Sequence, residues 1–227
     1  MTYDLFYAHP CYSSWSLRAW LIFQHFDLPY TPIEVDIYRG GKSRDLAPVA
    51  PARTVPVLRT PEGYVIGDSL ALAETLVERH PDQPLWPLDG AARALARWIT
   101  AEMHSGFSAL RNTCPMVLTH QITDFTPGSD VLGDLGRIED LWSLARSRHG
   151  STGPWLFGHY TLADAFYAPV AMRIAGYDLP VGAEARAYVQ THLEDPAIVK
   201  WRAMGLADPI TPPPYNVPGT QGDWPGA

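Results

Sequence analysis

Asp68 and Ser69 stand where a short apolar segment gives way to a helical pattern. A serine hydroxyl and the free backbone N–H groups of a helix N-terminus together suit a carboxylate. Earlier in the chain, Pro56 precedes another short apolar segment, so it must lie at a strand start or in a turn. The Val55–Pro56 bond is a candidate for the cis form, which would direct the carbonyl and N–H of Val55 outward. The sequence therefore predicts an exposed backbone edge beside an anion site, suited to a small extended peptide with a free carboxylate.

A hairpin followed by a helix would hold these residues in place. Residues 57–58 and 65–66 are apolar and predict two short strands, joined by a turn that contains proline and glycine. From residue 70 to residue 77, apolar side chains recur at helical spacing. The alternative interpretation of Asp68 and Ser69 is that they only cap this helix.

The order of these motifs resembles the glutathione transferase family, and the resemblance extends over most of the chain. The sequence shows, in order, a predicted strand at 4–7, the serine-rich helix start Ser13-Ser14-Trp15-Ser16-Leu17-Arg18, a predicted strand near 33–37, Val55-Pro56 and Asp68-Ser69. The serine cluster followed by Arg18 is most similar to the zeta-like and related bacterial serine classes. The resemblance implies a thioredoxin-like α/β N-terminal domain that binds glutathione, followed by an all-α helical domain.

The chain divides near residue 81. Residues 81–90 contain three prolines and a glycine, which predicts a linker between a thioredoxin-like domain at 1–80 and an all-helical acceptor-substrate domain at 91–210. Residues 211–227, with five prolines and three glycines, predict a tail that lies over the surface or is disordered. Apolar periodicity predicts helices at 91–112, 131–149, 162–175 and 183–193.

Thr161 and Asp164 form a near-capping box, with aspartate in place of the usual glutamate or glutamine. It matches the N-capping motif that the transferase family places in the core of its helical domain. Both the local interpretation and the resemblance assign it to folding, with no catalytic role.

The chemistry that the resemblance implies begins at the first helix, where the family places the sulfur of glutathione. A free thiol has a pKa of about 8.5, so only a small fraction is thiolate at neutral pH. One hydroxyl donor and the partial positive charge of a helix N-terminus favour the thiolate. Ser13 is the predicted donor because its spacing to Arg18 matches the family pattern, and Ser14 is the second candidate. The alternative is that one of these serines is only an N-cap.

Two neighbouring residues compete for that role. Tyr7 occupies the place of the donor in tyrosine-type transferases, although it also suits a core aromatic residue of the first strand. Cys11 with Ser14 forms a C-x-x-S pattern that resembles monothiol glutaredoxins, which would make the protein a thiol oxidoreductase.

The resemblance also implies the remaining contacts of glutathione. The backbone of Val55 would pair with the cysteinyl unit as a short piece of added strand. Ser69 and the helix N-terminus would hold the γ-glutamyl carboxylate and Asp68 the ammonium, although most family members have glutamate or glutamine at that position. Two loop cations would meet the glycyl carboxylate. The predicted glutathione-binding residues are Lys42, Arg53, Val55, Pro56, Asp68 and Ser69.

The acceptor substrate is expected against the first helix of the second domain. Met103, His104, Phe107 and Arg111 are the predicted acceptor-binding residues, and Gly106 within the helical pattern suggests close backbone packing or room for a ligand. Arg111 could bind a carboxylate of the acceptor. The alternatives are core positions for Met103 and Phe107, a surface or capping role for His104, and a helix-end cation for Arg111.

The composition is that of an ordinary soluble protein, because its 227 residues are 46% hydrophobic and 18% charged. A net charge of −7 without a basic run argues against nucleic acid as a partner. No stretch approaches the ~20 consecutive apolar residues of a membrane span. The N-terminus lacks the pattern of a signal peptide, and two cysteines are too few for a disulfide framework, so a cytoplasmic protein is expected. The eight histidines show no paired spacing, so no metal is predicted.

The sequence thus predicts a homodimeric glutathione transferase that conjugates the thiolate of glutathione to a small electrophile. The first alternative is a zeta-like cis–trans isomerase of the maleylacetoacetate isomerase type, although Trp15 stands where the zeta pattern has a cysteine. The others are a glutaredoxin-like oxidoreductase that uses Cys11 and a non-catalytic ligand-binding protein.

Overall fold

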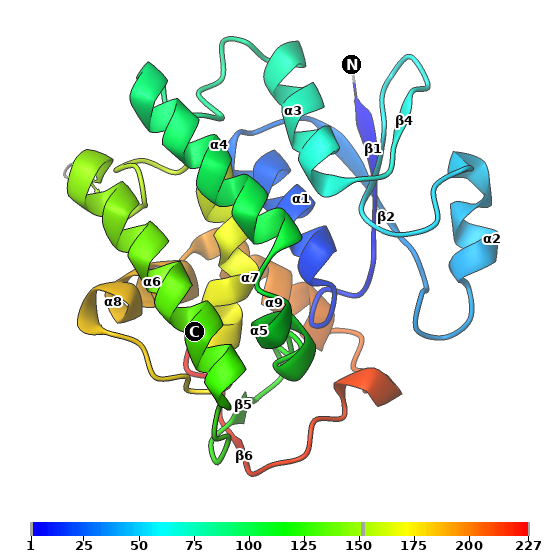
Figure 1. Ribbon diagram of the computed structural model, residues 1–227. Helices are drawn as coiled ribbons and strands as arrows, with labels where there is room; N and C mark the ends of the chain where they lie inside the picture. The colour runs from blue at the N-terminus through cyan, green and yellow to red at the C-terminus, as the bar shows by residue number, and fades with distance from the viewer. Residues whose placement is uncertain (1, 151–152, 227) are drawn as a thin grey trace.

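The computed structural model describes residues 2–150 and 153–226. Its N-terminal part is built on a four-stranded sheet in the order β2-β1-β3-β4 (Figure 1). Strand β1 pairs in parallel with β2 and antiparallel with β3, and β3 pairs antiparallel with β4. The sequence elements of this part are β1 (Tyr3–Tyr7), α1 (Ser14–His25), β2 (Tyr30–Glu34), α2 (Lys42–Leu46), β3 (Val57–Arg59), β4 (Val65–Ile66) and α3 (Ser69–Arg79).

Apolar side chains pack against both faces of strand β1. This packing fixes the position of the strand's C-terminal end, from which the chain continues to α1. Leu5 packs into the core that includes α1 and α3, whereas Phe6, the next residue, packs with Val35 and Val57 on the other face. Alternate residues of a strand point to opposite faces, so a strand buried on both sides is apolar throughout. The thioredoxin-like fold expected from the sequence is confirmed.

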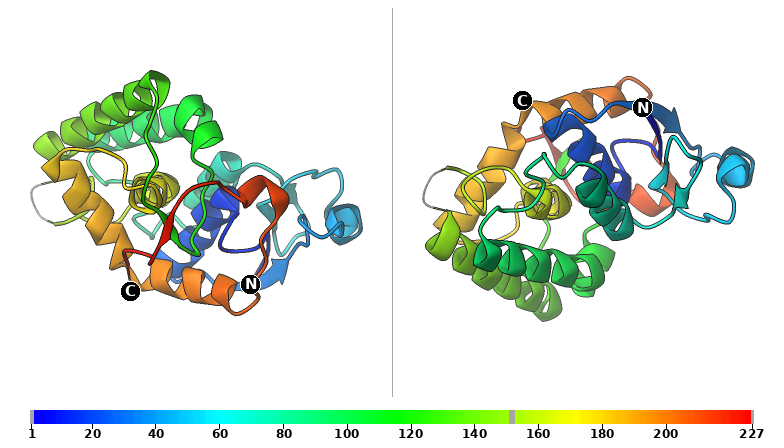
Figure 2. Two further views of the ribbon diagram at one scale, coloured as in Figure 1. Left: turned by 90° about the horizontal axis from the view of Figure 1, so that it is seen from below. Right: turned by 90° about the horizontal axis from the view of Figure 1, so that it is seen from above.

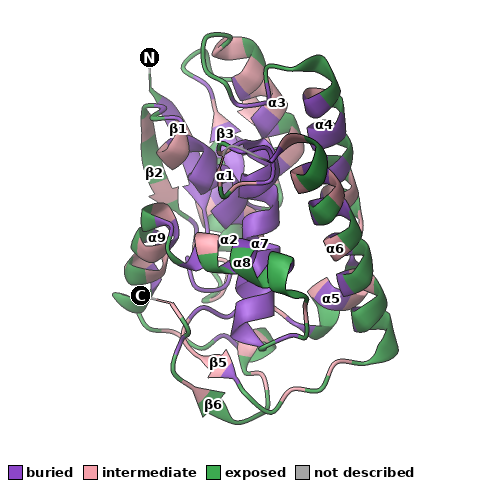
Figure 3. Cartoon of the chain, turned by 90° about the vertical axis from the view of Figure 1, so that its left-hand side faces the viewer, coloured by how far each residue is buried: buried purple, intermediate pink, exposed green. Residues whose placement is uncertain are grey.

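The second part of the chain is helical, as expected. It contains α4 (Gly90–Ser105), α5 (Ser108–Thr113), α6 (Ser129–His149), α7 (Leu162–Gly176), α8 (Ala183–Leu193) and α9 (Pro196–Leu206). Every residue of α7 is buried, as its purple ribbon in Figure 3 shows. Seen end-on, this helix lies at the centre of the surrounding helices (Figure 2). Within the described ranges, no helix is long and apolar enough to cross a membrane.

The start of α7 has the capping box that its sequence predicts. The Thr161 N–H donates to Asp164 Oδ2 at 2.8 Å, and Leu156 N–H and Tyr188 OH donate to Asp164 Oδ1 at 3.1 and 2.8 Å. Burial raises the pKa of Asp164, and these hydrogen bonds oppose that effect. The carboxylate therefore joins α7, α8 and the preceding loop.

The single helix expected at 91–112 is wrong, because the chain breaks between α4 and α5. Gly106 ends α4, and Phe107 adopts the left-handed conformation with φ of 54°. A Cβ at Gly106 would lie 2.7 Å from the carbonyl oxygen of Glu102, so the close approach requires glycine. Apolar periodicity continues through this break, which explains why the sequence pattern missed it.

The tail was expected to lie over the surface or to be disordered, and most of its described residues are exposed or half-buried. It contains a 3₁₀ turn, η2 (Pro213–Tyr215), and strand β6 (Gln221–Gly222), which pairs with β5 (Gln121–Ile122). Trp224 is 9% exposed and joins the core. Helices α2 and α9 were also missed, and the strand predicted near 33–37 lies earlier, as β2.

Candidate functional site

Two adjoining pockets lie where the N-terminal sheet meets the helices. The first, here the Ser69 pocket, has a volume of about 260 Å³ and is lined by Trp15, Thr54, Val55, Pro56, Gly67, Asp68, Ser69 and His104. The second, here the Ser14 pocket, has a volume of about 180 Å³ and is lined by Tyr12, Ser13, Ser14, Trp15, Ile37, Tyr38, Lys42, Thr54, Val55 and Tyr215. The pockets share Trp15, Thr54 and Val55, so an extended molecule can occupy both.

The Ser69 pocket is built on the N-terminus of α3. Asp68 is the N-cap, and its Oδ1 accepts hydrogen bonds of 2.9 Å from the N–H groups of Leu70 and Ala71. Ser69 is 2% exposed, and its hydroxyl has no hydrogen-bond partner among the described residues. A buried hydroxyl without a partner at a helix N-terminus suits a carboxylate.

Val55 provides the edge that joins the two pockets. The Val55–Pro56 bond is cis, as the sequence predicts. Within the described part of the chain, neither the N–H nor the carbonyl of Val55 makes a hydrogen bond. Free backbone groups of this kind can pair with an extended peptide.

Ser13 and Ser14 differ in what their hydroxyl groups do. Ser13 is the N-cap of α1, is 6% exposed, accepts from Ser16 N–H at 3.3 Å and donates to Ser16 Oγ at 2.7 Å. Its hydroxyl hydrogen is therefore already used inside the protein. Ser14 Oγ accepts from Nη2 of Arg173 at 3.3 Å, and no described residue accepts the Ser14 hydroxyl hydrogen. Of the two serines, Ser14 keeps a donor for a ligand.

Three arginines surround this helix start. The guanidinium carbons of Arg18 and Arg111 lie 4.3 and 4.7 Å from the ring centroid of Trp15, and Arg173 contacts Ser14. None of the three makes a salt bridge within residues 2–150 and 153–226. Burial lowers the pKa of Arg18 and Arg173, and repulsion between the guanidinium groups lowers both further. The site therefore carries positive charge that no carboxylate of the described residues balances by a salt bridge.

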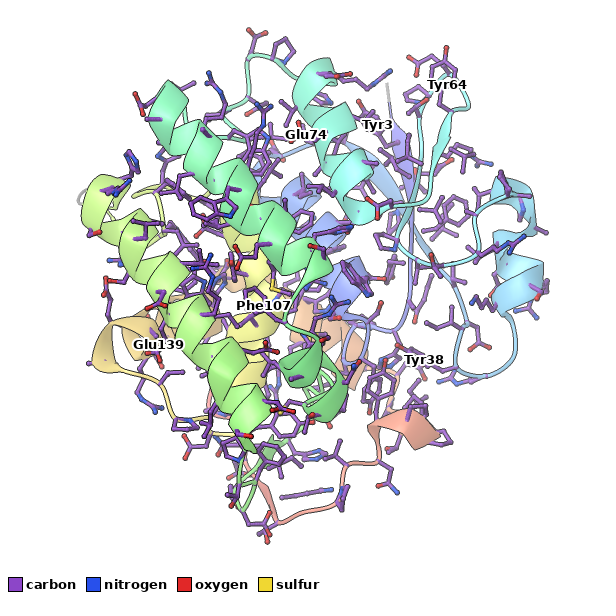
Figure 4. The ribbon with its side chains drawn as sticks, in the orientation of Figure 1. Tyr3, Tyr38, Tyr64, Glu74, Phe107 and Glu139 are labelled. Atoms are coloured by element: carbon purple, nitrogen blue, oxygen red, sulfur yellow. The ribbon has the colours of Figure 1, made fainter. Side chains whose placement is uncertain are left out.

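The predicted acceptor residues lie in different surroundings. Met103 is fully buried and Phe107 is 6% exposed, so both side chains belong to the core, and Figure 4 shows Phe107 among the helices. Arg111 donates from Nη1 to the carbonyls of His104 and Gly106 at 3.4 and 3.2 Å, beside its contact with Trp15. Arg111 thus also ties down carbonyl groups at the end of α4.

His104 lines the Ser69 pocket, whereas the other three predicted acceptor residues line neither pocket. Its Nε2 lies 3.2 Å from Asp68 Oδ2, and its ring packs edge-on against Trp15. The helical domain therefore reaches into the pocket that the sequence assigns to the N-terminal domain alone.

The two predicted loop cations are separated by the structure. Lys42 is the first residue of α2 and lines the Ser14 pocket. Arg53 is exposed and lies outside both pockets. Only Lys42 is placed to meet a ligand that spans Val55.

Comparison with known proteins agrees with this geometry. Residues 12–79 match the family model "Glutathione S-transferase, N-terminal domain". Residues 12–79 therefore belong to the family of glutathione S-transferase N-terminal domains.

Curated relatives match only part of the chain. A probable maleylacetoacetate isomerase of Caenorhabditis elegans is 38% identical over 99 residues, and the maleylacetoacetate isomerase of Rattus norvegicus is 36% identical over 101 residues. The matched segments cover 44% of this chain and 45% and 46% of these relatives. The chain thus spans less than half the length of the curated relatives that it matches.

Solved structures match most of the chain. A glutathione transferase homologue from Burkholderia strain BGR1, with bound glutathione, has a TM-score of 0.66 and 21% identity, covering 92% of this chain and 100% of that one. A diazinon-metabolizing glutathione S-transferase of the silkworm Bombyx mori has a TM-score of 0.67 and 19% identity, covering 92% and 98%. These similarities establish the shared fold.

The two rival donors lie away from the pockets of this transferase fold. Tyr7 packs against Trp201, and burial, followed by the charge of Glu34, raises its pKa to about 12. Cys11 is fully buried against Gly205, and burial raises its pKa to about 11. Burial therefore disfavours the thiolate that a glutaredoxin-like reaction of Cys11 needs.

Four residues of the site escaped the sequence interpretation. Tyr12, Tyr38 and Tyr215 form aromatic walls of the Ser14 pocket, and in Figure 4 Tyr38 lies beside the C-terminal segment (red). The fourth is Arg173. Its signal was present, because it is the only charged residue between Asp164 and Asp178 in an apolar helix.

Within the described residues, no group of three histidine, cysteine, aspartate or glutamate side chains lies close enough to hold a metal ion.

Proposed function

We propose that the protein is a glutathione-dependent enzyme that activates the thiol of glutathione in the Ser14 pocket for attack on a small electrophile. One observation carries the proposal. Two hydroxyl groups with free bonding capacity, Ser69 and Ser14, lie in adjoining pockets joined by the free backbone edge of Val55. The spacing of functional groups along glutathione, a carboxylate at one end and a thiol beyond it, matches this order.

Each part of glutathione has a partner in the proposed complex. The γ-glutamyl carboxylate accepts from the hydroxyl and the N–H of Ser69 at the α3 N-terminus, because Asp68 already accepts from the next two N–H groups. The γ-glutamyl ammonium meets Asp68 Oδ2, which His104 already contacts. The cysteinyl backbone pairs with Val55, and Lys42 meets the glycyl carboxylate. The tripeptide thus lies extended along the edge between α3 and α1.

The thiol loses its proton to solvent, and the resulting thiolate accepts a hydrogen bond from Ser14. We assign this role to Ser14 and keep Ser13 as the alternative, because the Ser13 hydroxyl already donates to Ser16. The N-terminus of α1 adds partial positive charge, and the N–H groups of Ser14 and Trp15 make no hydrogen bond among the described residues. The thiolate then forms a bond to the electrophilic carbon of the acceptor. A leaving group departs with its bonding electron pair, or, at a conjugated double bond, the π electrons move to the neighbouring carbon, which takes a proton from solvent.

The acceptor is proposed to carry a carboxylate. Arg111 and Arg173 lie beside the Ser14 pocket without a salt-bridge partner in the described chain, so an anionic substrate would supply the missing charge. The aromatic walls formed by Tyr12, Tyr38 and Tyr215 suit a planar, unsaturated body for that acceptor.

A cis–trans isomerase is the second candidate, and two observations favour it. The curated relatives are maleylacetoacetate isomerases, and the uncompensated arginines suit a dicarboxylate. In that reaction the thiolate adds to one carbon of a conjugated cis double bond, the resulting single bond rotates, and elimination restores the double bond in the trans form. Glutathione is regenerated, so the same site serves both reactions.

Two further expectations belong to this proposal, a homodimer and a cytoplasmic location. Two aromatic side chains lie on the surface. Tyr64, at the tip of the β3–β4 hairpin (Figure 4), is 66% exposed, and Trp98 on α4 is 51% exposed. A second copy of the chain could cover such surface. Sedimentation of the purified protein tests the dimer directly.

Binding and turnover are tested in sequence. Isothermal titration should show that both glutathione and S-methylglutathione bind, because the Ser69 pocket does not touch the sulfur. The glutathione-bound protein is then incubated with aromatic electrophiles, unsaturated carboxylates or cis-enedioic acids, and the products are followed by NMR. Conjugates support the transferase, and trans product without consumption of glutathione supports the isomerase. Failure to bind glutathione contradicts both, and binding without any turnover leaves the non-catalytic binder.

A further inference from the structure

Arg173 is a buried cation in the middle of the most apolar helix. It is 4% exposed, and all the residues of α7 around it are buried. Its Nε donates to the carbonyl of Cys114 at 2.8 Å and its Nη1 to the carbonyl of Pro169 at 3.0 Å. Both contacts are to the backbone, so they fix the plane of the guanidinium group without neutralising its charge.

The remaining nitrogen of the Arg173 guanidinium group, Nη2, contacts Ser14, the residue proposed to donate a hydrogen bond to the thiolate. Nη2 of Arg173 lies 3.3 Å from Ser14 Oγ. With the hydroxyl oxygen accepting from Arg173, the hydroxyl hydrogen of Ser14 is directed elsewhere, and no other described residue takes it. A hydroxyl that accepts from a cation is also a stronger donor.

The groups that face Arg173 do not compensate its charge. Arg111 and Arg18 are positive, the side chains of Cys114, Tyr177 and Tyr215 contain no carboxylate, and burial raises the pKa of Tyr177. Burial, with repulsion from Arg111, lowers the pKa of Arg173 to about 10, which leaves it protonated at neutral pH. Burial raises the pKa of Cys114 to about 11, so that thiol does not supply a negative charge there. An anion formed next to Ser14 would therefore be the first negative charge in this cluster.

We propose that Arg173 is a positioning residue that orients the Ser14 hydroxyl toward the Ser14 pocket and, through its charge, favours an anion at that hydroxyl. This deepens the proposed function, since it rests on the thiol of glutathione lying at Ser14. Arg173 itself does not touch the sulfur. The thiol proton goes to solvent, the Ser14 hydrogen stays on its oxygen, and no bond to Arg173 forms or breaks.

The first test places a thiol directly beside Arg173 and needs no glutathione. The pKa of the introduced thiol is measured in Ser14→Cys and, as the matched control, in Ser13→Cys, by the pH dependence of alkylation with iodoacetamide. The native Cys11 and Cys114 are both buried, and burial raises their pKa values to about 11, so they react little over the range studied. Both introduced thiols share the α1 N-terminus, which lowers the pKa of each.

We expect the thiol of Ser14→Cys to titrate below the ~8.5 of a free cysteine and at least about one pH unit below that of Ser13→Cys. Arg173→Gln in the Ser14→Cys background should remove most of this difference. Arg202→Gln is the control for that change, because Arg202 also donates to a backbone carbonyl, that of Leu118, at 2.8 Å. If the pKa of the Ser14→Cys thiol is equal to or higher than that of the Ser13→Cys thiol, the proposal is overturned. This outcome decides the question even if Arg173→Gln does not fold.

The second test uses glutathione. In folded Arg173→Gln, the affinity for S-methylglutathione should stay within about threefold of the native value. The pKa of bound glutathione should rise by about one unit, so that turnover falls about tenfold at pH 6.5 and recovers at high pH. A purely structural Arg173 would instead lower turnover equally at every pH. If glutathione does not bind at all, the proposed function fails, and the alkylation experiment still decides the role of Arg173.

Discussion

The Ser69 pocket and the Ser14 pocket share three lining residues but are built in different ways. In the Ser69 pocket the groups proposed to bind the ligand are mainly local features, the N-terminus of α3, its cap and the Val55 edge, and Trp15 and His104 add side chains from α1 and α4. The Ser14 pocket is assembled from α1, the segment before α2, the Val55 edge and the C-terminal segment, with Arg173 of α7 behind it. The difference indicates that local structure binds the tripeptide, whereas tertiary structure sets the pKa of its thiol. Variants in one pocket should therefore change binding, and variants in the other should change reactivity.

Ser69→Ala should have the largest effect on binding. The lost bond is charge-assisted and contributes about 1.5–3 kcal/mol, so the Kd of glutathione should rise about tenfold to a hundredfold. The pKa of the bound thiol should not move, because Ser69 lies at the other end of the ligand. Titration calorimetry with glutathione and a pH titration of the saturated complex measure the two quantities. A shifted thiol pKa with unchanged affinity would reverse the roles of the pockets.

Arg111→Ala should act on the acceptor. We expect the KM of a carboxylate-bearing acceptor to rise about tenfold, the effect of losing a charged hydrogen bond of about 1.4 kcal/mol, with the KM of glutathione unchanged. A neutral electrophile serves as the control substrate and should respond less. If both acceptors or both substrates lose equally, Arg111 only ties down the end of α4.

Tyr215→Ala should have a smaller effect, about threefold to tenfold on the KM of a planar acceptor. Tyr215 packs 4.9 Å from the Tyr12 ring centroid and lines the Ser14 pocket, so its removal opens one wall. Tyr215→Phe keeps the ring and is the matched control, which should behave like the native protein. Equal losses in both variants would mean that the hydroxyl, and not the aromatic wall, matters.

Cys11→Ala should have the smallest effect. Cys11 lies outside both pockets, and burial raises its pKa to about 11, so conjugation should change by less than about twofold. The same variant is assayed for reduction of a glutathione mixed disulfide. Loss of all activity on this substitution, in a folded protein, would make the reaction a thiol–disulfide exchange.

The sequence predicted more of the Ser69 pocket than of the Ser14 pocket, because local patterns specify much of the first and tertiary packing assembles the second. Asp68, Ser69 and the cis Val55–Pro56 bond belong to short-range patterns that a few neighbouring residues specify. Tyr215 and Arg173 reach the Ser14 pocket only after the C-terminal segment and α7 have packed, and no spacing along the chain brings them together. The preference for Ser13 over Ser14 rested on spacing alone, whereas the hydroxyl of Ser13 donates to nearby Ser16 and the hydroxyl of Ser14 contacts Arg173 only through tertiary packing.

The predictions of secondary structure also succeeded where local patterns decide the structure and failed where contacts beyond those patterns decide it. The helices at 131–149, 162–175 and 183–193 were predicted within about two residues, as α6, α7 and α8. The break at Gly106 was missed because its cause is a carbonyl contact that periodicity does not record. The composition of the tail left open whether it lies over the surface or is disordered, and pairing of β6 with β5 and burial of Trp224, both tertiary contacts, hold it in place.

The central claim is that Ser14, and not Ser13, donates to the thiolate. The most direct measurement is the ultraviolet absorbance of bound glutathione thiolate as a function of pH in the native protein, Ser13→Ala and Ser14→Ala, each saturated with glutathione. We predict a pKa of bound glutathione that rises by about one to two units in Ser14→Ala, the loss of one charge-assisted bond. In Ser13→Ala the pKa should stay near the native value, while loss of the N-cap lowers the free energy of unfolding by about 1 kcal/mol. A raised pKa in Ser13→Ala with none in Ser14→Ala would contradict the account.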